Sequence, residues 1–355
     1  MFKKGLILVL VSLLILSLVG CGAQKSGGDN ASQNQAPASN SGDKIVMKIA
    51  HAAKPGSARD LGAQKIKEVV EKETNGKVEV QIYPASQLGG GRDLIEGMQM
   101  GTIEMVILPS SFLGGFQPLT TIMDLPFYFP DDVNALLKVE QSEAARKLLD
   151  TTEEIGVKTM MIWHTGYKQF TANKPLTKPE DFKGLKFRTM PSPIQMEQYY
   201  VLGATPINME FSETYNALQT GAIDGQENPL DTTYDMKFHE VQKAVTLSRH
   251  GVLDQFIMVS KTWYESLPKE IQDAIMKGVE EGQKVTLEKT YENEKKALEE
   301  FKAKGLQIVE LTPEQRQAFV EATKGLRDIY VNKYGDRAAE ILKTFDEAIK
   351  QATAK

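Results

Sequence analysis

Arg188 and Asn228 are side chains suited to binding an anion. Arg188 stands near the end of a predicted strand, just before Pro191, and ligand clefts of α/β proteins form at strand ends. Its guanidinium group is planar, always charged and able to give a carboxylate two parallel hydrogen bonds. Asn228 is held in extended geometry by Pro229, and its amide can both donate and accept. This pattern predicts recognition of an anion, with a surface arginine and a plain turn asparagine as the alternatives.

Motifs of the common enzyme classes do not occur in the sequence. It contains no G-x-S-x-G, no G-x-x-x-x-G-K-[ST] and no H-E-x-x-H, and Gly89–Gly91 do not make a dinucleotide fingerprint. The four histidines lie far apart and lack the i, i+4 spacing of a metal site. We therefore predict no catalysis, no cofactor and no metal.

The N-terminus is typical of an exported lipoprotein. Lys3 and Lys4 precede an apolar run that is short for a membrane span, so residues 1–20 are predicted to be a signal peptide. The run ends in LVGC, which resembles a bacterial lipobox, and predicts lipidation of Cys21, the only cysteine. An uncleaved anchor with an incidental cysteine is the alternative. Residues 21–43 are rich in Gly, Ser, Asn and Gln and predict a flexible tether.

The charge balance excludes nucleic acid as a natural partner. Removing Lys3 and Lys4 from the 42 basic residues leaves 40 against 47 acidic residues, a net charge of −7. A protein this acidic lacks the basic surface that phosphate backbones require. A local pocket can still be positive and hold a small anion.

The order of predicted elements indicates an α/β protein with two lobes. The first lobe is predicted to contain strands at 46–52, 77–83 and 103–108 and helices at 57–73 and 92–100. The second lobe would follow a strand at 157–163, with strands at 167–172, 185–190 and 205–209 and helices at 192–202 and 212–220, the last capped by Ser212. MQMGTIEM (98–105) and LQTGAIDG (218–225) both read as helix, glycine and strand, which would make the lobes similar.

A long helix is predicted at 269–304, where 36 positions contain no proline. It would be roughly 50 Å long and lie across both lobes, or be broken near Gly278 or Gly282. We place lobe I at 44–165 with about 252–285, and lobe II at 166–251 with about 306–350. The C-terminal helices, from about 312 to 334 and from about 336 onward, are predicted to serve packing.

Several long segments resemble the substrate-binding proteins of tripartite ATP-independent periplasmic (TRAP) transporters. They are YPASQLGGGRDLIEGMQMGTIEM, DLPFYF, GYKQFTANKPLTKPEDFKGLKFR, LGATPINMEFSETYNALQTGAIDGQENP and FHEVQKAVTLSRHG, and the similarity covers nearly all of the chain from about residue 45. The resemblance implies a periplasmic-binding-protein-like fold whose two lobes close a cleft around an organic anion. It also implies an extracytoplasmic receptor that delivers this ligand to separate membrane carrier subunits.

The resemblance also suggests roles for single residues. Arg188 matches the strand arginine that pairs with the ligand carboxylate, Asn228 matches the DGQENP asparagine, and Phe211 holds the aromatic position beside the ligand, although core packing is its alternative. Lys168 stands where many members have a second arginine, and lacks that residue's bidentate fork. The phrase GYKQFTANKP looks like the C4-dicarboxylate subgroup, which favours malate, succinate or fumarate.

A dicarboxylate needs a second partner, because burying an unpaired charge is costly. Ser57 and Arg59, at the start of the first predicted helix, are expected to supply it together with the free amides of that helix. Gln87 is a similar candidate. A solvated Arg59 is the alternative.

Other functions remain open at this stage. The ligand could be another carboxylate, such as a 2-oxo acid or a sugar acid, and the receptor could present it to a sensor. An extracytoplasmic enzyme would have Glu213, Asp224 and Glu227 as its acid or base candidates. A structural lipoprotein would bind no small molecule.

Overall fold

The computed structural model describes residues 44–354. The predicted signal peptide, Cys21 and the tether lie outside these residues. Within them, no helix has the length and apolar character needed to cross a membrane.

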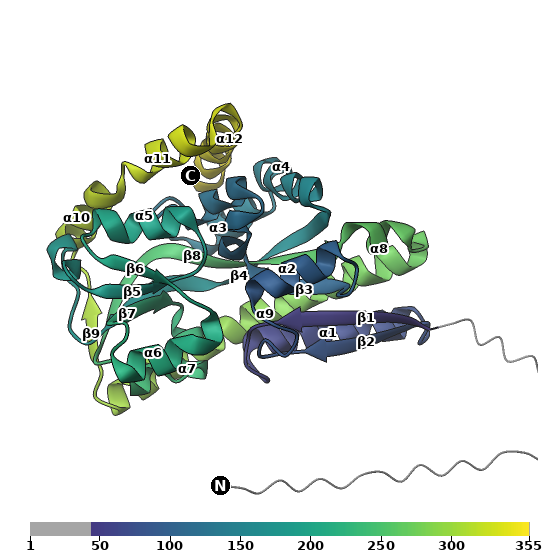
Figure 1. Cartoon of the computed structure of the whole chain (residues 1–355), viewed down its shortest axis with the longest axis horizontal. Coiled ribbons are helices and arrows are strands. Elements are labelled where there is room, and N and C mark those ends of the chain that lie inside the picture. The colour runs from purple at the N-terminus through teal and green to yellow at the C-terminus, as the bar shows by residue number, and fades with distance from the viewer. Residues whose placement is uncertain (1–43, 355) are drawn as a thin grey trace, which may run out of the picture. The chain divides into compact units, whose positions relative to one another are not determined.

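One mixed sheet organises the described residues, in the strand order β2-β1-β3-β8-β4-β7-β5-β6, with β9 paired to β8. The strands are β1 (Ile45–His51), β2 (Val78–Tyr83), β3 (Met105–Pro109), β4 (Val157–Ala172), β5 (Lys186–Thr189), β6 (Thr205–Asn208), β7 (Gly225–Asn228), β8 (Ala244–Ser260) and β9 (Gln307–Glu310). The long antiparallel strands β4 and β8 are central and run through both halves of the sheet (Figure 1).

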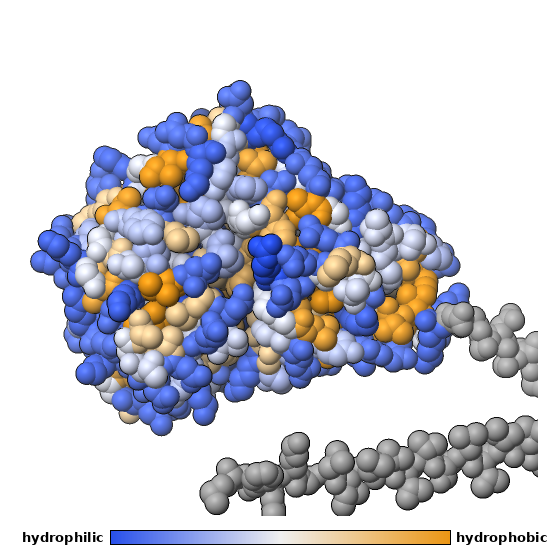
Figure 2. All heavy atoms as spheres, in the orientation of Figure 1, coloured by the Kyte–Doolittle hydropathy of each residue, from blue (hydrophilic) through white to orange (hydrophobic). Residues whose placement is uncertain are grey.

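Helices pack around this sheet, most of them between consecutive strands (Figure 1). They are α1 (Ala58–Glu73), α2 (Gly91–Gln99), α3 (Val133–Glu140), α4 (Glu143–Asp150), α5 (Pro193–Val201), α6 (Thr214–Thr220), α7 (Leu230–Asp235), α8 (Lys261–Ser266), α9 (Lys269–Ala303), α10 (Pro313–Thr323), α11 (Leu326–Tyr334) and α12 (Asp336–Thr353). Hydrophilic side chains cover most of the face in Figure 2, and hydrophobic ones form scattered groups.

The two halves of the sheet repeat one arrangement, as the paired motifs predict. β1 lies between β2 and β3 in parallel pairing, and β3 continues antiparallel to β8. β5 lies between β6 and β7 in the same way, and β7 continues antiparallel to β4. Each motif ends its helix at a left-handed glycine, Gly101 (φ +71°) or Gly221 (φ +73°), before β3 or β7. A side chain there would strain the backbone.

The predicted lobe boundaries fall inside strands. The strands expected at 157–163 and 167–172 are one strand, β4, and the boundary between 165 and 166 lies within it. The second boundary, between 251 and 252, lies within β8. The pairing of β4 with β8 shifts register between His164 and Tyr167, so a bulge takes the place of the break that the sequence pattern suggests.

Two local predictions were wrong. Ser212 does not cap a helix, because a 3-10 turn at Phe211–Glu213 precedes α6 and no side chain caps that helix. The helix expected at 312–334 is two helices, since α10 ends at Thr323 and α11 begins at Leu326, on either side of Gly325. Glycine has the weakest helix propensity of the non-proline residues, which fits a break at this place.

The long helix α9 is continuous and contacts α1 in the first half and α7 and β9 in the second. Of the two alternatives, the break near Gly278 or Gly282 is excluded by this continuous helix. These glycines instead allow close packing: a Cβ atom at Gly282 would lie 2.7 Å from the ring of Trp163 and 2.9 Å from the carbonyl oxygen of Gly62. α1 and α9 therefore approach backbone to backbone.

Candidate ligand-binding site

Arg188 lies on β5 and is almost fully buried, with 2% of its surface exposed. Its Nε and Nη2 donate to the carbonyl oxygen of Met209 at 3.3 and 3.2 Å. Among residues 44–354, its Nη1 has no hydrogen-bond partner. Burial lowers the pKa of Arg188 to about 10, although Glu210 and Glu227 partly offset this effect. The group remains charged at neutral pH, and its charge is only partly compensated.

Arg188 and Arg59 both lie beside the ring of Phe211. The guanidinium carbon of Arg188 lies 5.6 Å from the centre of the Phe211 ring, and that of Arg59 lies 6.0 Å from it. Arg59 is buried in the first turn of α1 and donates from Nη2 to Thr232 Oγ1 at 3.2 Å. Burial lowers the pKa of Arg59, and Asp231 and Asp235 raise it. The two halves of the fold thus each place one buried cation beside the same ring.

The two remaining candidates from the first half differ in position. Ser57 caps α1, and its hydroxyl accepts a hydrogen bond from the amide of Asp60 at 3.4 Å. It is buried and lies two residues before Arg59. Gln87 is exposed in the loop after β2, and its side chain makes no hydrogen bond with residues 44–354. Of these candidates, Arg59 is the one in contact with Phe211.

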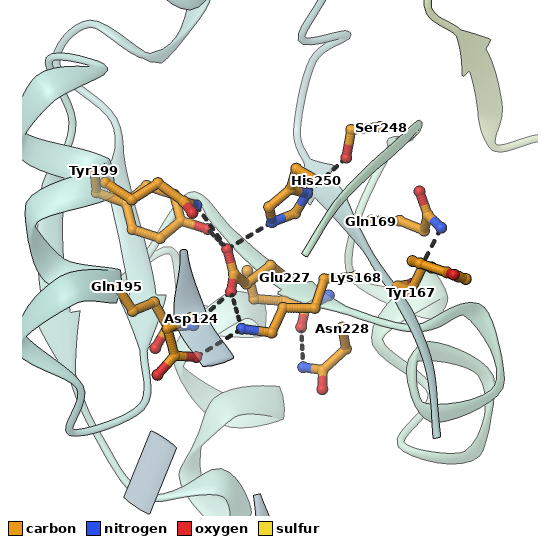
Figure 3. A network of polar contacts seen from close by, with 12 residues as sticks. Asp124, Tyr167, Lys168, Gln169, Gln195, Tyr199, Glu227, Asn228, Ser248 and His250 are labelled. Atoms are coloured by element: carbon orange, nitrogen blue, oxygen red, sulfur yellow. Dashed lines mark hydrogen bonds and ion pairs between the residues drawn. The ribbon is translucent and has the colours of Figure 1, made fainter. Parts of the chain in front are cut away.

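Lys168 lies on β4 and is engaged with two protein carboxylates (Figure 3). Its Nζ is 3.1 Å from Asp124 Oδ1 and 3.1 Å from Glu227 Oε1, and all three side chains are buried. Burial opposes the charge on Lys168, but Glu227 and Asp124 raise its pKa above the ordinary value. Two of the three ammonium hydrogens are therefore used within the protein.

Glu227, on β7, is the centre of this network (Figure 3). Besides Lys168, four side chains donate to its carboxylate: Gln195, Gln198, Tyr199 and His250. Burial alone would raise the pKa of Glu227, but Lys168 and His250 hold it well below the ordinary value. A carboxylate this heavily paired has no proton to donate, so it is a poor catalytic acid.

Asn228 follows Glu227 and ends β7, where it is 3% exposed. Successive residues of a strand point to opposite faces, so the fixed carboxylate of Glu227 orients its neighbour. The Nδ2 of Asn228 donates to Gln226 Oε1, and Gln226 donates to Thr171 Oγ1 on β4. The amide of Asn228 is thus held by a hydrogen bond within β7, and its partner Gln226 is held by a hydrogen bond to β4.

The partners of Glu227 were not found from the sequence. Gln195 and Tyr199 come from α5, His250 from β8, and Asp124, which pairs with Lys168, from a third segment; Glu227 itself was considered only as a catalytic candidate. A signal was available, because Asp124 lies in DLPFYF and His250 lies in FHEVQKAVTLSRHG, two of the segments that carry the TRAP resemblance.

Comparisons with known proteins agree with this arrangement. A family profile described as "Bacterial extracellular solute-binding protein, family 7" matches residues 49–333. The C4-dicarboxylate-binding periplasmic protein DctP of Rhodobacter capsulatus is 38% identical over 318 residues, which are 88% of this chain and 92% of that protein.

Two solved structures with bound ligands are also similar. A TRAP periplasmic solute-binding protein from Desulfovibrio salexigens with bound orotic acid has 37% identity and a TM-score of 0.85, over 87% of this chain and 100% of that chain. One from Shewanella oneidensis with bound succinate has 32% identity and a TM-score of 0.80, over 85% of this chain and 99% of that chain.

These matches confirm the predicted family and its two-lobed α/β fold, and they cover the whole region that holds Arg59, Lys168, Arg188, Phe211 and Asn228. The function at this level is reception of small organic acids outside the cytoplasm. The chain belongs to the family 7 bacterial extracellular solute-binding proteins, which are the substrate-binding receptors of TRAP transporters and not enzymes.

Proposed function

We propose that this receptor binds a C4-dicarboxylate, such as malate, succinate or fumarate, and delivers it to a TRAP membrane carrier. The observation that carries the proposal is the pair of buried guanidinium groups, Arg59 and Arg188, beside the ring of Phe211. Two cations from different halves of the fold suit a ligand with a carboxylate at each end.

The distances of the two arginines from Phe211 set an upper limit on the length of a ligand held between them. Their guanidinium carbons cannot be farther apart than the sum of their distances to the Phe211 ring, 6.0 and 5.6 Å. A four-carbon diacid in extended form, with a guanidinium group at each end, spans about 12 Å between the guanidinium carbons, so it already reaches this upper limit. A longer diacid would have to fold or push the arginines apart.

In this proposal each candidate residue has a distinct role. Arg188 pairs with one carboxylate through its unpaired Nη1, and the amide of Asn228 binds the same end. Arg59, Ser57 and the first amides of α1 bind the other carboxylate. Phe211 packs under the carbon chain between them.

Two of the sequence candidates stand apart from this set. Lys168 is already paired with Asp124 and Glu227, so we expect it to position Glu227 and the adjacent Asn228. Gln87 is exposed in the loop after β2 and its side chain makes no hydrogen bond with residues 44–354, so we assign it no contact with the ligand.

A planar ring acid is the second candidate, because the similar receptor from Desulfovibrio salexigens holds orotic acid. Orotate would pair its carboxylate with Arg188 and stack its ring near Phe211, leaving Arg59 to its existing partners. Under this alternative, loss of Arg59 would weaken binding far less than loss of Arg188.

Calorimetry with succinate, malate, fumarate and orotate tests these alternatives. For the true ligand, Arg188→Ala should cost about 2 to 5 kcal/mol, the range for truncating one partner of a buried charge pair. Arg59→Ala should cost a comparable amount for a diacid and much less for orotate. Arg337→Ala is a control, since Arg337 is exposed and paired with Glu154. Affinity close to that of the wild type in Arg188→Ala would contradict the proposal.

We also propose that the receptor is anchored to the outer side of the cell membrane through lipidated Cys21, after removal of residues 1–20. Supporting this are the basic start, the short apolar run and the lipobox-like LVGC of the sequence. Cys21→Ser should release the protein from the membrane fraction without changing its affinity for the ligand. Continued membrane association of this variant would contradict the anchor.

A further inference from the structure

A second polar cluster, formed by Glu140, His164 and Asp254, has no role in the proposed ligand site. Glu140 ends α3, and His164 and Asp254 face each other across β4 and β8. All three side chains are buried, with at most 1% of any of them exposed. His164 Nδ1 lies 2.9 Å from Asp254 Oδ1 and 3.6 Å from Glu140 Oε1.

The two carboxylates of this cluster are poorly satisfied. Among residues 44–354, neither oxygen of Glu140 has a hydrogen-bond partner, and the same holds for Oδ2 of Asp254. Within that range the basic side chain at ion-pair distance from them is the imidazole of His164. Buried carboxylate oxygens without donors cost free energy, so this arrangement calls for a cation that all three side chains can share.

The imidazole of His164 is oriented as a metal ligand would be. Its Nε2 lies 3.1 Å from the hydroxyl of Tyr291 on α9, and its Nδ1 faces the carboxylates. When Nε2–H donates to Tyr291, Nδ1 carries a lone pair toward Asp254 and Glu140. Metal-ligating histidines are commonly held through their second nitrogen in this way.

The distances fit a tetrahedral transition metal. Zinc bonds of about 2.0 to 2.2 Å place neighbouring ligand atoms about 3.4 Å apart. The two distances from His164 Nδ1, 2.9 and 3.6 Å, bracket this value, and one ligand atom from each residue lies within 4.8 Å of the others. One nitrogen and two oxygens, with a fourth position open, suit Zn²⁺ better than Ca²⁺, which needs six to eight oxygens.

A surface cavity lies beside the cluster. Glu140 borders a surface cavity of about 240 Å³, together with Gln141, Arg146, Leu149 and Met160–Ile162. Both carboxylate oxygens of Glu140 are buried, so an ion would load from this cavity only after side chains move.

From this geometry we propose that Glu140, His164 and Asp254 bind one divalent transition-metal ion of the Zn²⁺ type. The ion would join α3 to the two long strands next to the register shift between His164 and Tyr167, where β4 and β8 pass between the halves of the fold. Its direct effect is to stabilise this junction, separately from the arginines that hold the ligand.

The competing state is a proton in place of the metal. Burial, followed by the nearby charge of Asp254, raises the pKa of Glu140 well above its ordinary value.

The test uses the full chain, purified without a histidine tag, treated with EDTA and then titrated with Zn²⁺ alone. We expect one tightly bound equivalent by competition with a chromophoric chelator and by elemental analysis, and a rise of several degrees in Tm. Glu140→Gln keeps the side-chain volume and should weaken Zn²⁺ binding at least 10-fold, in the range for a lost metal-site interaction.

Two variants make the test decisive. Asp254→Asn should reproduce the loss if Glu140→Gln fails to fold. Glu104→Gln is the matched control, because Glu104 is also a buried glutamate but accepts a hydrogen bond from the amide of Lys48; its Zn²⁺ binding should equal that of the wild type. Absence of a stoichiometric site in the wild type, or equal Zn²⁺ affinity in Glu140→Gln and Glu104→Gln, would overturn the proposal.

Discussion

Replacing Lys168 by methionine measures how much the pairing of Lys168 with Asp124 and Glu227 contributes to the free energy of unfolding. Methionine is similar in length to lysine but carries no charge, so the variant leaves Asp124 and Glu227 buried without their shared cation. Removing one partner of a buried ion pair costs about 3 to 5 kcal/mol. For a domain of a few hundred residues, 1 kcal/mol shifts Tm by roughly 2 to 4 °C, so a loss of about 10 °C is expected at neutral pH.

The pH dependence of the stability loss distinguishes an unpaired buried charge from a simple change in packing. In the wild type the pKa of Glu227 lies well below its unfolded value, so its contribution is complete above that value and is lost as the pH falls through the folded pKa. Without Lys168, burial dominates and the pKa of Glu227 rises. The folded variant then takes up a proton at higher pH than the wild type, and the stability gap between the two proteins narrows as the medium is acidified.

Thermal unfolding followed by circular dichroism at neutral and mildly acidic pH measures both effects. Lys168→Met/Glu227→Gln is the paired control, because it removes one buried charge of each sign and should recover part of the lost stability. Lys269→Met controls for loss of an exposed lysine. A neutral-pH loss below about 1 kcal/mol, the level of a surface pair, would refute the reasoning, as would a gap between wild type and Lys168→Met that does not change with pH.

Three further predictions follow from single contacts. Gly282→Ala should cost about 1 to 3 kcal/mol by denaturant unfolding, because its methyl group would overlap Trp163, and unchanged stability would contradict the close helix packing. Burial raises the pKa of Glu294 to about 8. Protonated Glu294 therefore contributes stability below the ordinary pKa of glutamate, and this contribution is lost as the pH rises toward 8. The Tm of the wild type should fall over this range, and that of Glu294→Gln should fall less. Ser57→Ala should cost about 1 kcal/mol of stability as a lost helix cap, and a larger relative loss of ligand affinity by calorimetry would reveal direct contact with the ligand.

The sequence predicted those parts of the fold whose signals are local. β1, α1 and β2 follow from alternation and helical periodicity within short segments, and α9 ends within one residue of its predicted end at 304. β8 was not predicted, because Ser248–Gly251 interrupt its apolar pattern with polar residues whose partners are distant. His250, for example, is explained only by Glu227 on β7.

The candidate site also has some features that the sequence could predict and others that it could not. Arg188 and Asn228 could be proposed from their immediate neighbours and from the family resemblance, and Arg59 from its place at a helix start. The contact of both arginines with Phe211 could not, since it depends on how the halves of the sheet come together. Lys168 was expected to bind the ligand because of the family resemblance, and the sequence does not show its pairing with Asp124 and Glu227.

The choice of lysine at 168 and arginine at 188 follows from these different surroundings. A lysine ammonium is a compact charge that can serve two permanent carboxylates at once, and Lys168 does so at 3.1 Å from each. Arg188 lies near the same Glu227 but hydrogen-bonds to a backbone carbonyl, and burial leaves its pKa lowered. The network therefore neutralises one cation and leaves the other short of a partner. In the proposed function a ligand carboxylate would supply that partner, because Glu227 is already fixed by its own network. Exchanging the two cations should then abolish ligand binding even where the variant folds.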